Sequence, residues 1–223
     1  MEQNGLIKNQ KAYQIFASTD PALFSFTTIE ELRQSADVEA PEDEESQVAE
    51  DELYMDNWLH SALTVTGILS ILEEVLKPGT KVLDLGCGNG YMSVALAQLV
   101  SPNGKVVAVD SSQEKLDAAK RTVSEHFPQL LPVIDFQLKD AFAEHEGAPF
   151  EAVHVGGGVQ EVPQAWLQLV RPGGSLIAAT PEIEPNTQET QFMLRKYYVR
   201  PEGGVQPINL MFVQYEELVE PSM

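Results

Sequence analysis

The stretch Val82-Leu83-Asp84-Leu85-Gly86-Cys87-Gly88-Asn89-Gly90 is typical of a short buried strand that runs into a glycine-rich turn. Glycine accepts positive φ angles and lets a backbone approach a ligand closely. Twenty residues further on, a second apolar run over 106–109 ends in Asp110. An acid at the tip of a second strand suits the two hydroxyls of a ribose. Strand, glycine turn, helix, strand and acid together predict a nucleotide-type cofactor site in a doubly wound α/β domain.

The spacing of the glycines narrows the kind of cofactor. A dinucleotide fingerprint needs G-x-G-x-x-G, which directs helix N-terminal amides at a pyrophosphate. Here the glycines fall at 86, 88 and 90, and Asp84 precedes them. The pattern D-x-G-x-G-x-G resembles motif I of class I S-adenosylmethionine-dependent methyltransferases. The alternative interpretation is an ordinary tight β-α turn.

Apolar periodicity along the chain predicts alternating strands and helices after a helical N-terminal part. We expect an open, doubly wound, mostly parallel sheet of the Rossmann-like class I methyltransferase type, with an N-terminal helical extension and C-terminal antiparallel strands. The expected helices are 5–18, a turn at 28–34, 57–76, 90–101, 113–126 and 163–170, and the expected strands are 80–85, 105–110, 133–138, 150–155, 175–180, 189–200 and 206–216. The domain boundary is expected between an extension over 1–56 and a methyltransferase domain over 57–223.

The charge of the chain limits the classes of molecule that it is expected to bind. The formal net charge of the 223 residues is −20, and 12 of the acidic residues against one basic residue lie between Thr27 and Asp56. An acidic chain lacks the basic footprint that phosphate backbones require, so we expect no nucleic-acid substrate. Residues 35–53 are expected to form a mobile acidic loop because they have no apolar period.

The sequence also lacks features typical of membrane, secreted and metal-binding proteins. No run approaches the roughly 18 apolar residues of a membrane helix, and the first residues are too polar for a signal peptide. The single cysteine, Cys87, predicts a reducing, cytoplasmic location. We interpret Cys87 as a small residue filling the turn, and we find no cluster with the spacing of metal ligands. We expect a monomer without metal or membrane partner.

A longer block gives a family resemblance. Residues 149–179, PFEAVHVGGGVQEVPQAWLQLVRPGGSLIAA, resemble the corresponding block of protein-L-isoaspartate O-methyltransferases. The opening residues 4–24 resemble the first helix of that family, and residues 211–214 lie where the family ends in a strand. The resemblance covers about 1–26 and 62–217. It implies an enzyme that methylates the carboxylate of isoaspartyl residues in damaged peptides or proteins, with S-adenosyl-L-methionine as the methyl donor.

The resemblance also implies roles for individual positions. The methionine end of the cofactor would lie against the turn that begins at Asp84, and the ribose would lie against the second strand tip. Asp140 with Ala141 would meet the adenine amine, and the end of the fourth strand would form the floor near the methyl group. The implied cofactor residues are Asp84, Gly86, Cys87, Gly88, Asn89, Gly90, Asp110, Ser111, Asp140, Ala141, His154 and Gly156. His154 as a core histidine and Asp140 as a solvated loop acid stay open as alternatives.

The segment before the first strand departs from the family. The family's substrate string, whose serine contacts the acceptor carboxylate, is absent, and residues 54–62 stand in its place. Counting back from Leu76 puts His60 at the serine position, and one residue of slippage puts Ser61 there. We therefore predict His60 and Ser61 as the acceptor-side catalytic candidates. Glu216 stands about where the family often has threonine.

Three hypotheses follow. The first is a divergent isoaspartyl O-methyltransferase. The second is a methyltransferase of the same fold with a cationic or neutral acceptor, which the acidic residues near the entrance and His60 favour. The third is a non-catalytic module that binds the cofactor or a basic partner protein.

Overall fold

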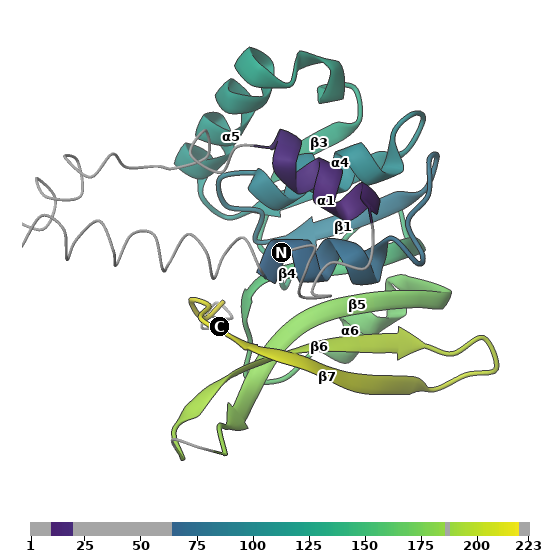
Figure 1. The fold of residues 1–223 in the computed structure, drawn as a ribbon, viewed down its shortest axis with the longest axis vertical. Coiled ribbons are helices and arrows are strands. Elements are labelled where there is room, and N and C mark those ends of the chain that lie inside the picture. Colours follow the sequence, from purple (N-terminus) through teal and green to yellow (C-terminus); the bar gives the residue numbers. More distant parts are fainter. Residues whose placement is uncertain (1–9, 20–63, 186–187, 219–223) are drawn as a thin grey trace, which may run out of the picture.

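The computed structural model describes residues 10–19, 64–185 and 188–218 (Figure 1). They form one seven-stranded sheet in the order β3-β2-β1-β4-β5-β6-β7. The strands are β1 (Lys81–Leu85), β2 (Lys105–Asp110), β3 (Ile134–Leu138), β4 (Phe150–Gly158), β5 (Val170–Ile183), β6 (Thr190–Val199) and β7 (Val205–Val213). The helices are α1 (Gln10–Ser18), α4 (Tyr91–Val100), α5 (Gln113–His126) and α6 (Gln164–Gln168), with a 3-10 turn η3 (Pro128–Leu130) and a helical stretch over 64–72.

The sheet is parallel from β3 to β5 and antiparallel from β5 to β7. Parallel neighbours require crossover connections, which α4 and α5 supply between the first three strands. The strand order reverses direction between β1 and β4, and such a switch point is where open α/β sheets bind ligands. The predicted doubly wound, mostly parallel sheet with antiparallel C-terminal strands is therefore confirmed.

Two hydrophobic clusters hold the layers together, one on each face of the sheet. Alternate residues of the parallel strands face opposite sides, as the two-residue period of a strand requires. Val82 and Ala108 belong to the cluster that contains α4, whereas Leu83 and Val109 belong to the cluster that contains Trp166 of α6. Because both faces of β1 and β2 are covered, these strands are apolar almost without interruption.

Helix α1 packs on α4 as part of the same core. Ala12 and Ile15 are buried in the α4-side cluster, and Lys11 donates from Nζ to the carbonyl oxygen of Leu99 at 3.3 Å. Figure 1 shows α1, in purple, lying against α4. The N-terminal helix is thus attached to the sheet domain by apolar contacts.

Several element bounds differ from the sequence prediction. The helix expected over 163–170 spans Gln164–Gln168, because Phe150 donates from its backbone nitrogen to the carbonyl oxygen of Leu169 and draws the next residues into the sheet. Strand β5 accordingly begins at Val170, not at residue 175, and crosses the expected turn with a register shift against β4. Strand β4 extends to Gly158 in place of residue 155.

The remaining differences lie toward the N-terminus. The helix expected over 57–76 is helical over 64–72 and continues as turns, and its first residues lie outside the described part. The expected turn at 28–34, the acidic loop over 35–53 and both His60 and Ser61 also lie outside the described residues. Across the described ranges, no helix has the length and apolar character needed to cross a membrane.

Candidate functional site

The glycine turn after β1 has the backbone conformation that its sequence predicts. Gly86, Gly88 and Gly90 have φ angles of 69°, 53° and 85°, a region that side-chain-bearing residues rarely enter. A Cβ built at Gly88 would meet no atom of the described residues within 4 Å, so these residues leave this part of the turn open. A Cβ at Gly90 would lie 3.0 Å from the Cβ of Ala119 in α5. Glycine is thus required at 90 by packing and at 88 by conformation.

The tip of β2 is tied directly to that turn. The Asp110 carboxylate accepts hydrogen bonds from the backbone nitrogens of Gly88 at 2.8 Å and Ser112 at 2.9 Å. Asp110 is 8% exposed, whereas Ser111 beside it is exposed. Each carboxylate oxygen has two lone pairs, so both oxygens retain acceptor capacity for a hydroxyl-bearing ligand. Asp110 therefore fixes the backbone of the turn at Gly88 and keeps acceptor capacity beside it.

Asp84 lies beneath the turn and is fully buried. Its two carboxylate oxygens accept from Ser93 Oγ at 2.5 Å and pair with His154 Nδ1 at 2.7 Å. Parallel pairing of β1 with β4 sets Asp84 beside His154, and α4 brings Ser93 from above. A buried carboxylate is stable only when its oxygens are satisfied in this way. The His154 Nε2 atom has no hydrogen-bond partner within the described part of the chain.

The Cys87 thiol is buried in the turn. Burial, followed by the negative charges of Asp84 and Asp110, holds the pKa of this thiol well above its usual range. A protonated thiol is a poor nucleophile and a poor metal ligand. This protonation state agrees with the interpretation of Cys87 as a small residue that fills the turn. No group of three or more His, Cys, Asp or Glu residues that could hold a metal occurs among the residues described.

The loop after β3 is fixed by contacts from α6. Asp140 accepts a hydrogen bond from the backbone nitrogen of Phe142 at 2.7 Å, which shapes the start of the loop. The Ala141 carbonyl oxygen accepts from Trp166 Nε1 at 3.1 Å, and the Phe142 and Trp166 rings lie 5.0 Å apart. His145 Nε2 lies 2.9 Å from the same carbonyl, and burial lowers the pKa of His145. Asp140 and Ala141 are partly buried, so the loop presents them at the carboxyl edge of the sheet.

The end of β4 packs tightly against the glycine turn. A Cβ built at Gly156 would lie 2.3 Å from the carbonyl oxygen of Gly86, so only glycine fits this approach. Gly158 makes two backbone hydrogen bonds to the chain after β7. Its nitrogen donates to the Glu216 carbonyl at 2.8 Å, and its carbonyl accepts from the Leu218 nitrogen at 2.7 Å. The Leu218 side chain would lie within 3.3 Å of a Cβ at Gly86. The segment 214–218 therefore crosses the strand tips.

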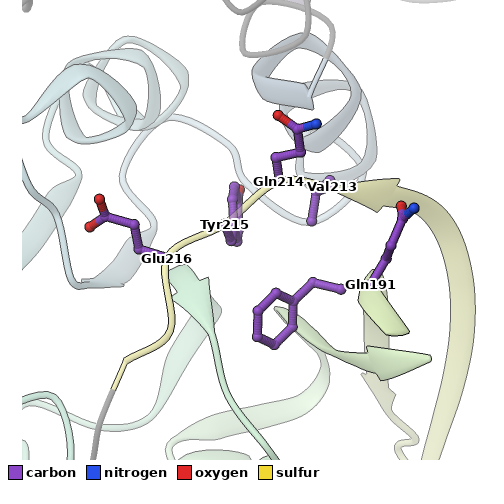
Figure 2. A pocket seen from close by; sticks show the side chains of 6 residues that line it. Gln191, Val213, Gln214, Tyr215 and Glu216 are labelled. Atoms are coloured by element: carbon purple, nitrogen blue, oxygen red, sulfur yellow. The ribbon is translucent and has the colours of Figure 1, made fainter. Parts of the chain in front are cut away.

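Beside this segment lies an open groove of about 490 Å³, lined by Gln191, Phe192, Val213, Gln214, Tyr215 and Glu216. Figure 2 shows the Tyr215 ring between Glu216 and Gln191. The described lining residues carry two amides, one phenol and one carboxylate, and none of them is cationic. We call it the β6–β7 groove.

The structure brings most of the sequence-predicted residues to one edge of the sheet. The glycine turn, Asp110, Asp140 and Gly156 all stand at strand ends, whereas Asp84 and His154 lie beneath them as a buried pair. The cofactor roles assigned to these residues stay predictions, as does the role of His60 or Ser61.

Sequence reasoning missed four contributors, namely Ser93, Trp166, Tyr215 and Leu218. For Ser93 a signal exists, because a serine three residues into the helix after a glycine turn stands over the strand that precedes the turn. The contacts of the other three depend on tertiary packing.

Comparison with protein families gives one match over almost the whole chain. Residues 1–220 match the family model described as protein-L-isoaspartate(D-aspartate) O-methyltransferase. A Triticum aestivum protein-L-isoaspartate O-methyltransferase is 25% identical over 188 residues, which cover 79% of this chain and 73% of the relative. An Arabidopsis thaliana protein-L-isoaspartate O-methyltransferase 2 is 32% identical over 118 residues, which cover 49% of this chain and 37% of the relative. The chain thus spans well under two thirds of some curated relatives that it matches.

A solved structure matches the fold. A Plasmodium falciparum protein assigned as a protein-L-isoaspartate O-methyltransferase, crystallised with S-adenosyl-L-homocysteine, superposes with a TM-score of 0.70. The match covers 98% of this chain and 94% of that one at 18% identity. At this identity the likeness shows a shared fold.

Proposed function

This chain belongs to the protein-L-isoaspartate(D-aspartate) O-methyltransferase family, and we therefore propose that it transfers a methyl group from S-adenosyl-L-methionine to the carboxylate of isoaspartyl residues in damaged proteins. The observation that carries the proposal is the convergence of the glycine turn, Asp110 and Asp140 on one edge of the sheet in a chain that matches the family over residues 1–220. The crystallised relative from Plasmodium falciparum, which holds S-adenosyl-L-homocysteine, supports the choice of donor.

The residues at the strand tips fit this cofactor. No described residue fills the space at Gly88, whose nitrogen donates to the Asp110 carboxylate, and Asp110 retains lone pairs for ribose hydroxyls. Asp140 and Ala141 would hold the adenine end. Asp84 is buried with both oxygens bonded, so we propose that it acts on the methionine end through its negative charge and by fixing the turn. When bound, the cofactor supplies an electrophilic methyl group on a sulfonium.

The reaction requires the protein mainly to position the two reacting groups. An acceptor carboxylate is already ionised at neutral pH, so no general base is needed. Its oxygen forms the new O–C bond while the S–C bond breaks, and the electron pair stays on sulfur. The enzyme contributes by holding oxygen and methyl carbon in line and by excluding water. Rigid strand tips, tied together by the contacts of Asp110 and Gly158, suit that task.

A specific observation favours a second candidate, in which the acceptor is neutral or cationic. None of the described residues that line the β6–β7 groove is cationic, and Glu216 is one of them. Residues 54–62 also lack the family's substrate-contacting sequence, so they do not favour an isoaspartyl carboxylate over another acceptor. A net charge of −20 would also favour cationic over anionic acceptors during encounter, although salt screens exposed charges beyond about 8 Å.

Two measurements on the full chain test the proposal. Tritiated methyl transfer from S-adenosyl-L-methionine should yield a base-labile methyl ester on an isoaspartyl peptide and none on its aspartyl counterpart. Calorimetry should show binding of S-adenosyl-L-homocysteine. Binding without transfer to the isoaspartyl peptide would contradict the first acceptor and leave the second candidate or a non-catalytic module, which a panel of amine and neutral acceptors would separate.

We also propose a peptide or protein partner, a monomeric state and a cytoplasmic location. The family match supports the peptide partner, and the monomer can be tested by sedimentation. The exclusion of nucleic acids stays a prediction from charge.

A further inference from the structure

The segment that follows β7 places Tyr215 next to the strand tips. Hydrogen bonds between Gly158 and both Glu216 and Leu218 fix the backbone on the far side of Tyr215, and β7 fixes the near side. The Leu218 side chain adds apolar contact to Gly86 and Gly157. Tyr215 is therefore held at the carboxyl edge of the sheet, beside the end of β4.

The Tyr215 ring packs against the α4-side hydrophobic cluster and forms part of the β6–β7 groove (Figure 2). Its hydroxyl has no hydrogen-bond partner in the part of the chain that the structure describes. Burial and the negative charge of Asp84 raise the pKa of this phenol above its usual range. The group is therefore an unused hydrogen-bond donor that stays protonated, close to the buried carboxylate under the glycine turn.

Among the described residues that line this groove, Tyr215 alone carries a hydroxyl group. The amides of Gln191 and Gln214 and the Glu216 carboxylate likewise have no side-chain partner within the described residues. A protonated phenol suits an anionic oxygen, because an O–H donor to a carboxylate makes a short and strong hydrogen bond. The flanking amides suit the backbone of an extended peptide.

We propose that the Tyr215 hydroxyl donates a hydrogen bond to the acceptor carboxylate and that the β6–β7 groove holds the peptide on which that carboxylate lies. This inference rests on the proposed function and names an acceptor-binding residue for it. Tyr215 keeps its proton throughout, since the carboxylate loses its charge by forming the ester bond to the methyl carbon.

The direction of charge change decides which kinetic constant Tyr215 affects. The acceptor carboxylate carries a full negative charge when it binds and progressively less as the ester forms. A donor to that oxygen therefore stabilises the bound substrate at least as much as the transition state. Its removal should raise KM and leave kcat little changed, which is the signature of a binding interaction.

Tyr215→Phe tests the proposal, because it removes only the hydroxyl. With an isoaspartyl peptide, we expect KM to rise roughly tenfold or more, as for a lost hydrogen bond to a charged group, and kcat to change less than about threefold. Affinity for S-adenosyl-L-homocysteine should stay unchanged. Tyr198→Phe is the matched control, since Tyr198 lies at the other end of β6 and pairs with Ser175. It should leave KM as in the wild type.

A binding measurement keeps this test separate from that of the proposed function. Calorimetry of the isoaspartyl peptide against the complex with S-adenosyl-L-homocysteine needs no turnover and should show the same tenfold loss in Tyr215→Phe. Methyl transfer with equal KM in the two proteins would overturn the inference and leave the proposed function standing. Loss of S-adenosyl-L-homocysteine affinity in Tyr215→Phe would assign the hydroxyl to the donor. Failure of the wild-type complex to bind the peptide would refute the inference outright.

Discussion

Replacing Ser93 by alanine isolates the contribution of one hydrogen bond to the buried carboxylate under the glycine turn. Ser93 and Asp84 are both inaccessible to solvent, and the serine hydroxyl donates to Asp84 at 2.5 Å. Alanine fills nearly the same volume, so the change removes a donor without opening a cavity. A hydrogen bond to a charged group contributes about 1.5–3 kcal/mol, and water cannot replace it here. We expect Ser93→Ala to lower the free energy of unfolding by about that amount.

Ser175→Ala is a matched control within the same chain. Ser175 is also fully buried, in β5, but its hydroxyl has no hydrogen-bond partner within the described residues. Removing an unsatisfied buried hydroxyl relieves a desolvation cost, so this variant should be neutral or more stable than the wild type. The two variants remove the same atom from equally buried sites and differ only in whether that atom has a partner.

Urea unfolding followed by circular dichroism gives the measurement, with the free energy extrapolated to water. Equal slopes for the three proteins are required for the comparison, because a changed slope would signal a departure from two-state unfolding. An equal loss of stability in both variants would refute the reasoning, since burial alone would then explain it. No loss in Ser93→Ala would show that His154 alone satisfies Asp84.

Three further outcomes are expected. Asp110→Ala should weaken binding of S-adenosyl-L-homocysteine by about 1–3 kcal/mol in calorimetry. The change removes the carboxylate proposed to accept from the ribose hydroxyls, and it also removes the hydrogen bond from the Gly88 nitrogen. An unchanged affinity would contradict the ribose assignment. Iodoacetamide should alkylate Cys87 far more slowly in the folded protein than in urea at pH 9, because the raised pKa of the folded protein's thiol keeps it protonated. The same pKa shift stabilises the folded protein below the ordinary thiol pKa, and this stabilisation is lost as the pH rises above it. Equal alkylation rates would refute burial of the thiol. Glu216→Gln should reduce any preference for peptides with lysine over glutamate beside the isoaspartyl residue by about twofold to fivefold at low salt, whereas Glu202→Gln, an equal charge change in the β6–β7 turn, should not.

The sequence predicts the parallel half of the fold well because its signals are local. Strand β2 and helix α5 have the predicted bounds, since an apolar run ends in Asp110 and Ser112 caps the next helix by accepting from the Lys115 backbone nitrogen. Glycine at 86, 88 and 90 predicts the turn because the ability to adopt a positive φ angle depends on the residue type at each position and not on distant contacts. These features need no knowledge of distant parts of the chain.

The region around α6 and β5 was predicted less well because its bounds depend on a neighbouring strand. Arg171-Pro172-Gly173-Gly174 has the composition of a turn, and Gly173 does have a φ of 80°. Pairing of Val170 with Phe150 nevertheless draws this stretch into the sheet as an irregular strand. Sequence composition reports the local bend, whereas the hydrogen bonds to β4 decide that the strand begins before it.

The candidate site shows the same division between local and distant information. Asp84 and Asp110 have the same residue type at the ends of adjacent strands, and a motif alone suggests ligand contact for both. The structure separates them, because α4 and β4 enclose Asp84 with Ser93 and His154. Asp110 instead accepts from backbone nitrogens within the described residues, and its oxygens retain lone pairs. The proposed acceptor-binding residue depends still more on distant parts of the chain, since Tyr215 reaches the strand tips only because β7 returns antiparallel along the sheet. A motif therefore predicts the proposed donor half of such a site, whereas the proposed acceptor half follows from the antiparallel return of the C-terminal strands.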